Sequence, residues 1–262
     1  MHVSGLMNMQ YAIENDTVYV LEANPRASRT VPLVSKVCNI RMVPLATDIV
    51  TAELTGRPSP VPALKEQDIP YYGVKESVFP FNMFQEVDPL LGPEMRSTGE
   101  VLGIASTSGE AYYKAQEATQ LKLPTEGSVL ISVNNSDKPE VVDLAKLYDQ
   151  AGFKIFATGK TYDLIAGAGI DAVKAKKEYE GRPSIRDMIV NGEVQLVINT
   201  PSGKESPYSD SYVRKSAIKA KIPYMTTIAA GKAGGEGILE IKSESSVGVR
   251  SLQEWHSMIK PR

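Results

Sequence analysis

The chain has 262 residues, 42% of them hydrophobic and 23% charged, and its formal net charge is -2. These values are typical of a globular chain with room for one large or two modest domains, and the near-neutral charge argues against a general nucleic-acid-binding protein. The single cysteine, Cys38, excludes an internal disulfide and fits a reducing compartment. No apolar run approaches the roughly 20 residues that span a bilayer, and no signal peptide is evident, so we expect a cytoplasmic protein without membrane contact.

Two strands, over residues 6–13 and 17–22, are predicted to open the chain as a hairpin. The second is apolar and rich in β-branched residues, which predicts a buried strand, and Pro25 should end it. A two-residue turn would put Gln10 out of register with Glu22, whereas a three-residue turn would place the two opposite each other on one face.

An oxygen-rich group closes this hairpin. Glu22 and Asn24 lie two positions apart, so they project from the same face of a strand, and Arg26 and Arg29 follow. Such a pair suits Mg²⁺ that bridges phosphate oxygens, and the arginines could neutralise charge on a transferring phosphoryl group. The alternative is a surface salt bridge from Glu22 to Arg26 or Arg29, which on spacing alone is the commoner arrangement.

Helices and extended segments are predicted for the next hundred residues. The predicted helices are 31–37, 44–54 and 108–120. The predicted extended segments are a strand over 71–81, a Gly- and Pro-rich loop over 91–101 and a linker over 124–127. Gly56 is expected to stop the second helix. Pro58, Pro60 and Pro62 then enforce an extended loop.

Beyond the linker, predicted strands and helices alternate strictly. The strands are 129–133, 154–158, 172–175, 194–200 and 224–228, and the helices are 139–151, 162–168, 184–191, 210–221 and one near 251–259. Alternation with short connections predicts an α/β domain in which helices flank a parallel sheet. We therefore predict a first domain over residues 1–125 and a second over residues 126–262.

Polar side chains follow four strands of the second domain, at the edge where parallel sheets bind ligands. Hydroxyls, backbone amides of a helix N-terminus and nearby lysines make an anion site. For any single one of these residues, a role as a helix cap or as solvated surface charge is about as probable as a role in ligand binding. The presence of such residues at four strand ends favours a site for a phosphate-bearing ligand. Residues 158–161, Thr-Gly-Lys-Thr, imitate the end of a P-loop, yet Lys154 stands where its first glycine should be, and we reject that interpretation.

Two stretches of the first domain carry a specific resemblance. Residues 22–32, Glu-Ala-Asn-Pro-Arg-Ala-Ser-Arg-Thr-Val-Pro, are similar to the closing motif of ATP-grasp ligases and, through the continuation Ser-Arg-Thr-Val-Pro, to the carbamoyl-phosphate synthase large chain. Residues 91–101 resemble the sequence of the same family at almost every position. The second domain resembles the methylglyoxal synthase-like regulatory domain, of Rossmann type, that ends this large chain. The resemblance thus makes the first domain the C-terminal part of an ATP-grasp unit with a connecting segment.

The family makes carbamoyl phosphate from bicarbonate, glutamine-derived ammonia and two ATP. The resemblance implies that Gln10, Glu22 and Asn24 hold Mg²⁺ or Mn²⁺ at the ATP site that phosphorylates carbamate, with Gln10 and Glu22 also contacting ATP. It implies that Arg26 and Arg29 contact the phosphates or the product. Around the phosphate and ribose of a nucleotide effector, UMP or IMP, it places Ser132, Lys138, Thr158, Thr161, Lys177, Asn199, Thr200 and Lys204.

The implied partners are the remainder of the large chain and the glutamine amidotransferase small subunit, with homo-oligomer formation left open. Because this chain lacks the residues that would enclose adenine, we expect it to be inactive alone. The alternative is a free-standing nucleotide-binding regulatory module without catalysis. A lyase of the methylglyoxal synthase type is disfavoured, because Lys204 rather than an aspartate context follows the turn at Gly203.

Overall fold

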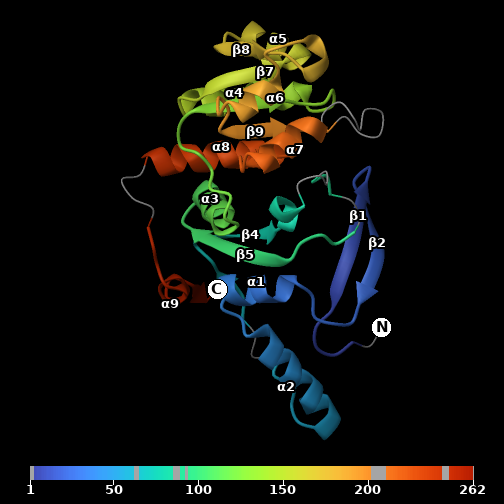
Figure 1. The fold of residues 1–262 in the computed structure, drawn as a ribbon. Helices are drawn as coiled ribbons and strands as arrows, with labels where there is room; N and C mark the ends of the chain where they lie inside the picture. Colours follow the sequence, from blue (N-terminus) through green and yellow to red (C-terminus); the bar gives the residue numbers. More distant parts are fainter. Residues whose placement is uncertain are drawn as a thin grey trace. The chain divides into compact units, whose positions relative to one another are not determined.

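A computed structural model of the chain describes residues 3–61, 65–84, 89–91, 94–201, 211–243 and 248–261 (Figure 1). Contacts between residues divide the chain into two compact units: unit 1 joins Met1–Tyr72 to Val249–Arg262, and unit 2 is Gly73–Gly248. Unit 2 is therefore inserted between two pieces of unit 1. The domain boundary that the sequence predicts near residue 125 stays a prediction.

Unit 1 contains a β-hairpin, helices and a short two-stranded sheet. Its described elements are β1 (Asn8–Glu14), β2 (Thr17–Asn24), α1 (Thr30–Val37), α2 (Met42–Thr55), β3 (Gln67–Asp68), α9 (Leu252–His256) and β11 (Lys260–Pro261). Its two pieces meet where β11 pairs antiparallel with β3 and where the Trp255 ring packs on Tyr71, with centroids 5.2 Å apart. The φ of Gly56 is 68°, in the left-handed region, which confirms the predicted glycine stop of α2.

The register of the hairpin puts the predicted metal-binding residues on one face. Asn15 and Asp16 form a two-residue turn with φ values of 48° and 60°, the signs of a type I′ turn. The ladder then shifts by one residue next to Gln10, at a β-bulge, so that Gln10 pairs with Glu22. The facing pair is thus present, but a bulge produces it rather than a longer turn.

The predicted burial of the second hairpin strand is wrong. Val18, Val20 and Leu21 are 59%, 57% and 64% exposed. The reason is that β1 and β2 pair only with each other among the described strands, so neither face of the hairpin is covered as the face of a larger sheet would be. The hairpin therefore presents apolar side chains to solvent.

Unit 2 contains most of the core. Its described strands are β4 (Tyr72–Val78), β5 (Gly99–Ala105), β6 (Ser128–Ser132), β7 (Lys154–Thr158), β8 (Ala172–Ala175), β9 (Leu196–Asn199) and β10 (Tyr224–Met225), of which β4 starts at the last residue of the first piece of unit 1. Its described α-helices are α3 (Ser108–Ala118), α4 (Val141–Gln150), α5 (Gly159–Gly167), α6 (Ile185–Val190), α7 (Ser211–Lys219) and α8 (Ile228–Ser243). Short 3₁₀ helices are η2 (Pro80–Met83), η3 (Lys138–Glu140) and η4 (Glu178–Glu180).

Five of these strands form a parallel sheet in the order β10-β9-β6-β7-β8, which confirms the predicted α/β class. Successive residues of β6 point to opposite faces: Val129 and Ile131 join one core with α4, α5 and α8, and Leu130 joins another with α6 and α7. Helices therefore cover both faces of the sheet (Figure 1). The central strands β6 and β9 are buried along their whole length, so their carboxyl ends are where a ligand can reach them.

Helix α3 is held between β5 and α8 by close backbone approaches. A Cβ on Gly103 of β5 would lie 2.6 Å from the Ala115 amide nitrogen of α3, and one on Gly237 of α8 would lie 2.6 Å from the Gly109 carbonyl oxygen. The Glu240 carboxylate of α8 also accepts a hydrogen bond of 2.7 Å from the Glu110 amide in the first turn of α3. The segment before the predicted linker is therefore packed onto α8.

Strands β3, β5 and β11 and helix α8 are absent from the sequence prediction. Strand β5 occupies part of the stretch predicted as a loop, and α8 follows β10, where no helix is predicted. Most other elements lie within a few residues of their predicted positions. Within the described ranges, no helix is both long and apolar enough to cross a bilayer.

Candidate functional site

A polar hollow of about 230 Å³ opens at the carboxyl ends of β6, β7 and β8. It is lined by Ser132, Val133, Asn134, Asn135, Lys138, Thr158, Gly159, Lys160, Thr161, Lys177, Tyr179 and Glu180. Five of the eight predicted effector residues, those that follow β6, β7 and β8, are therefore in the lining. This is the edge of a parallel sheet at which ligands are expected to bind.

Hydrogen bonds fix the floor of the hollow. The Ser132 and Thr158 hydroxyls, at the ends of β6 and β7, lie 2.7 Å apart, and both residues are buried. The Thr161 hydroxyl accepts a hydrogen bond of 3.4 Å from the Val133 amide. Because these hydroxyls join neighbouring strands, the floor is held in place before any ligand binds, which lowers the entropy cost of binding.

The N-terminus of α5 faces this hollow. Thr158 is its N-cap residue, but its side chain makes no capping hydrogen bond to the first turn, since the hydroxyl is paired with Ser132. Gly159 has a φ of 41°, a left-handed value that glycine adopts without a steric cost. The first-turn amides and the helix dipole favour a negative ligand here.

Three lysines and one glutamate give the lining a positive balance. Lys138 and Lys177 are half-buried, Lys160 is exposed, and Glu180 is the acidic residue. The Lys138 ammonium donates to the Asn135 side-chain oxygen, and the Glu180 carboxylate accepts a hydrogen bond of 2.7 Å from the Lys177 amide. The glutamate is thus engaged with the backbone, and the lysines supply the charge that an anion would meet.

The two predicted residues at the end of β9 do not line the hollow. Asn199 is fully buried: its amide nitrogen donates to the Ser132 carbonyl at 3.2 Å, and its oxygen accepts from the buried guanidinium of Arg214 at 2.7 Å. The Thr200 hydroxyl accepts from the Asn134 amide at 2.9 Å. Both residues therefore hold the carboxyl end of β6 and the turn after it by hydrogen bonds. Their contact with a ligand stays a prediction, and Lys204 lies outside the described residues.

Several lining residues were not predicted from the sequence. Asn134 closes the turn after β6, where its side-chain oxygen accepts from the Asp137 amide at 3.0 Å. An Asn-Asn-Ser-Asp sequence after a buried strand is the signal of such a turn and was available in the sequence. Tyr179 and Glu180 lie on η4, and nothing in a pattern of strands and helices predicts that this turn reaches the hollow.

The hairpin holds the second candidate site. Asn24 donates from its side-chain nitrogen to a Glu22 carboxylate oxygen at 2.8 Å, and Gln10 is the ladder partner of Glu22. Among the described residues no three His, Cys, Asp or Glu side chains gather into a metal-binding group. One carboxylate with two amide oxygens nevertheless fits Mg²⁺, which commonly uses one or two carboxylates and takes its other ligands from phosphate and water. The Arg26 guanidinium donates to the Ala27 carbonyl at 3.1 Å, and Arg29 is the N-cap residue of α1.

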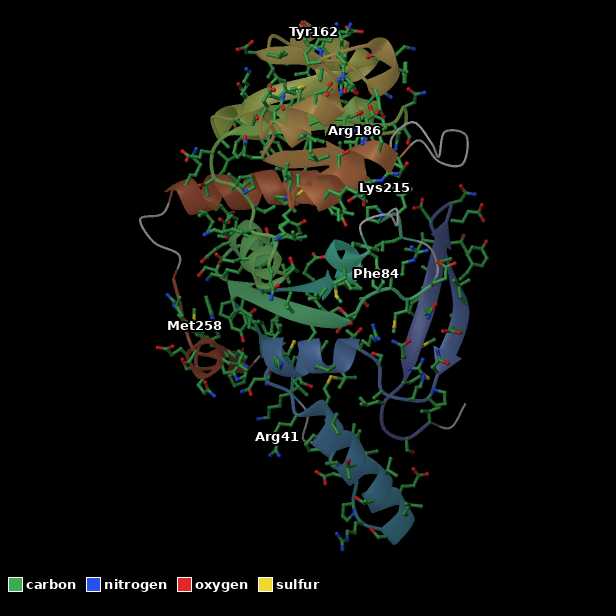
Figure 2. All side chains as sticks on the ribbon, viewed as in Figure 1. Arg41, Phe84, Tyr162, Arg186, Lys215 and Met258 are labelled. Carbon is green, nitrogen blue, oxygen red and sulfur yellow. The ribbon has the colours of Figure 1, made fainter. Side chains whose placement is uncertain are left out.

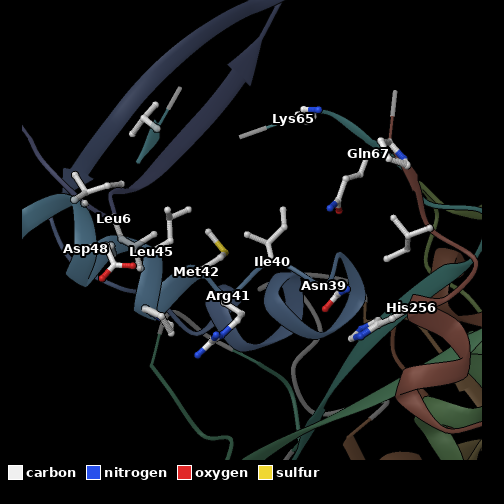
Figure 3. Close-up of a pocket in the computed structure, with 17 residues that line it drawn as sticks. Leu6, Asn39, Ile40, Arg41, Met42, Leu45, Asp48, Lys65, Gln67 and His256 are labelled. Atoms are coloured by element: carbon white, nitrogen blue, oxygen red, sulfur yellow. The ribbon is translucent and has the colours of Figure 1, made fainter. Parts of the chain in front are cut away.

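Unit 1 has a larger hollow of about 1040 Å³ beside the start of α2 (Figure 3). Its wall is mostly apolar, with Leu6, Ile40, Met42 and Leu45 among its residues, and with Arg41 at its edge. Besides Arg41, the ionisable side chains in its described lining are those of Asp48, Lys65 and His256. The described wall thus offers mainly an apolar surface.

Comparison with known proteins accounts for both halves of the chain. A section of the carbamoyl phosphate synthase large chain from Aquifex aeolicus (strain VF5), described as C-terminal, is 43% identical over 275 residues, which covers 98% of this chain and 51% of that protein. The large chain of Gemmatimonas aurantiaca is 45% identical over 258 residues, covering 98% of this chain and 23% of that protein. This chain is a relative of the carbamoyl phosphate synthase large chain. The predicted resemblance is thereby confirmed.

The chain spans about half the length of the Aquifex aeolicus section and about a quarter of the complete large chains. A family described as the MGS-like domain matches residues 140–226, from the end of η3 to just past β10. A methylglyoxal synthase from Elizabethkingia anophelis NUHP1 aligns over 41% of this chain and 76% of its own, with 19% identity and a TM-score of 0.34. The relatives are carbamoyl phosphate synthase large chains, and the MGS-like match in this chain includes the lining residues of the polar hollow from Thr158 to Glu180.

Proposed function

We propose that the polar hollow of unit 2 binds the phosphate and ribose of a nucleotide effector, UMP or IMP. The observation that carries this proposal is the convergence of Lys138, Lys160 and Lys177 with the uncapped first turn of α5 on one hollow. Helix amides and lysines are the groups that bind phosphate in proteins. Thr158 and Thr161 add hydroxyls at the floor, where phosphate oxygens would accept hydrogen bonds.

Lys177 is the lysine whose removal tests the proposal. Its side chain is half-buried in the lining, so a phosphate contact there is partly shielded from water. A charge-assisted hydrogen bond is worth about 1.5–3 kcal/mol, so Lys177→Ala should weaken effector binding about ten- to a hundred-fold. Lys160 is exposed, so Lys160→Ala should weaken it less.

Calorimetric titration of UMP and of IMP into the full chain measures these affinities. Lys146→Ala is the matched control, because Lys146 is an exposed lysine of α4 that pairs with Asp143 at 3.4 Å and does not line the hollow. Its variant should bind as the wild type does. Absent binding of both nucleotides, or an affinity indifferent to Lys177→Ala, would leave the hollow as ordinary helix caps and surface charge.

We further propose that the chain works as the C-terminal part of a carbamoyl phosphate synthase large chain, which would make it part of an ATP-dependent ligase. Its partners would then be the remainder of the large chain and a glutamine amidotransferase small subunit. The exposed apolar side chains of the hairpin support this, because a strand pair of this composition is normally covered by further structure. On this proposal the chain alone binds ATP weakly and is inactive.

In that setting the hairpin would serve the ATP site that phosphorylates carbamate. Gln10, Glu22 and Asn24 would hold Mg²⁺ or Mn²⁺, which would draw together the phosphate oxygens and offset their charge. Arg26 and Arg29 would lie against the phosphates or the carbamoyl phosphate product, as guanidinium groups bind phosphate through paired hydrogen bonds. The support is the shared hairpin face, the all-oxygen donor set and the nearby guanidinium groups.

A further inference from the structure

The hollow of unit 2 is small for a whole nucleotide. Its volume is about 230 Å³, below the roughly 300–1,000 Å³ of pockets that enclose a complete ligand. Its described lining is polar apart from Val133, Gly159 and the ring of Tyr179. A phosphate and a ribose match such a lining, and they would leave a base to lie at the rim. The side chains that contact the base must therefore lie at the edge of the hollow.

Tyr179 is the aromatic residue in that described lining, and it is 72% exposed. It lies two residues after Lys177, on η4, the short 3₁₀ turn that follows β8 in the chain. An exposed tyrosine alone is ordinary on a protein surface. What distinguishes this one is that it lines a hollow together with lysines and helix amides suited to phosphate.

Hydrogen bonds hold the turn that carries Tyr179. The Lys177 amide donates to the Glu180 carboxylate at 2.7 Å, and the Glu180 amide donates to the Lys177 carbonyl at 2.9 Å. The Glu178 amide donates to the Tyr212 hydroxyl of α7 at 3.2 Å, and its carboxylate pairs with the Arg186 guanidinium at 3.0 Å. Arg186 is labelled in Figure 2. The backbone of Tyr179 is therefore fixed on both sides while its ring stays open to solvent.

We propose that Tyr179 is the platform on which the base of the effector stacks, and that it determines the preference of the hollow for nucleotides over other phosphates. This rests on the proposed function of the same hollow. A tyrosine ring loses little conformational freedom on stacking, and the fixed turn lowers that cost further. Stacking accepts any base, because every base has a π-face, so the platform serves UMP and IMP alike.

The proposal makes a prediction that depends on the ligand as well as on the protein. Base–aromatic stacking is lost on alanine substitution with an effect of about five- to a hundred-fold on affinity. Tyr179→Ala should therefore weaken UMP and IMP by that factor and leave ribose 5-phosphate, which has no base, unchanged. Tyr179→Phe keeps the ring and loses the hydroxyl, so it should bind all three ligands nearly as the wild type does.

The experiment is calorimetric titration of UMP, IMP and ribose 5-phosphate into the full chain and its Tyr179 variants. Tyr19→Ala is the matched control, because Tyr19 is a 49% exposed tyrosine of the hairpin and does not line the hollow. Equal weakening of all three ligands by Tyr179→Ala would show that the residue orders the turn, and would overturn the stacking proposal while the phosphate site stands. Unchanged affinity for UMP and IMP would overturn it as well. If the wild type binds none of the three, the proposed function fails, and the stacking proposal fails with it.

Discussion

Replacing Gly103 of β5 with alanine should destabilise unit 2 through a collision with α3. A Cβ at this position would lie 2.6 Å from the Ala115 amide nitrogen and still closer to the Ala111 carbonyl oxygen. Both obstacles are backbone atoms of α3, so no side-chain rotation relieves them, and the helix must retreat by about 1 Å to reach an ordinary contact distance. The retreat is opposed on the other side of α3, where Gly109 already lies against Gly237 of α8.

The expected cost is large for a single methyl group. Overpacking a core costs about 1–3 kcal/mol, and the two-sided confinement of α3 puts Gly103→Ala near the upper end. At about 2–4 °C per kcal/mol for a chain of this size, the melting temperature of unit 2 should fall by roughly 6–12 °C. Thermal unfolding followed by far-ultraviolet circular dichroism measures this change.

Gly99→Ala is the matched control, because Gly99 lies in the same strand. A Cβ there would meet Val78 at 3.9 Å, an ordinary contact. The control should be neutral or more stable by about 0.4–1 kcal/mol, since alanine restricts the unfolded chain. If the two variants melt at the same temperature, α3 does not lie directly on β5 at Gly103, and the packing argument is refuted.

Two further predictions concern carboxylates. Burial raises the pKa of the Glu76 carboxyl in β4, although hydrogen bonds from Ser77 and Gln116 lower it in part. The contribution of Glu76 to stability therefore falls as the pH rises above about 4, the ordinary pKa of a glutamate in an unfolded chain. In urea unfolding, Glu76→Gln should be more stable than the wild type at pH 7 but no more stable near pH 4. In a large chain completed by its preceding segment, Glu22→Gln should abolish ATP-dependent phosphorylation of carbamate and spare bicarbonate-dependent ATP hydrolysis at the other ATP site. Equal loss of both activities would indicate misfolding and contradict the metal-binding role.

The fold of the second half was predictable because its strands and helices differ in pattern. Helix α8 was missed for a definite reason: Gly231, Gly234, Gly235 and Gly237 each lower helix propensity by about 1 kcal/mol. The structure shows why glycine is there. A Cβ on Gly235 would lie 3.0 Å from the Cβ of Leu147 in α4, and one on Gly237 would meet α3. Those neighbours are distant in sequence, so no local pattern reveals them.

The candidate sites were predictable to different degrees. Ser132, Thr158 and Lys177 follow directly from their positions at strand ends, because the carboxyl ends of parallel strands meet at one edge. The register of Gln10 with Glu22 was reached through a bulge, which the turn length alone does not predict. Tyr179 depends on the path of a short turn, and the inward orientation of Asn199 depends on Arg214, fifteen residues away on α7.

The insertion of unit 2 between the pieces of unit 1 has a consequence during protein synthesis. When Gly248 has been translated, every residue of unit 2 exists, whereas unit 1 still lacks α9 and β11. At about 5–20 residues per second, the first piece of unit 1 waits roughly 10–35 seconds for the partners of Tyr71 and β3. Throughout that interval Tyr71 lacks its Trp255 partner and β3 lacks its β11 partner, and such incomplete units are prone to association. Trp255 packs on Tyr71, so tryptophan fluorescence of this chain would report the joining of the two pieces of unit 1.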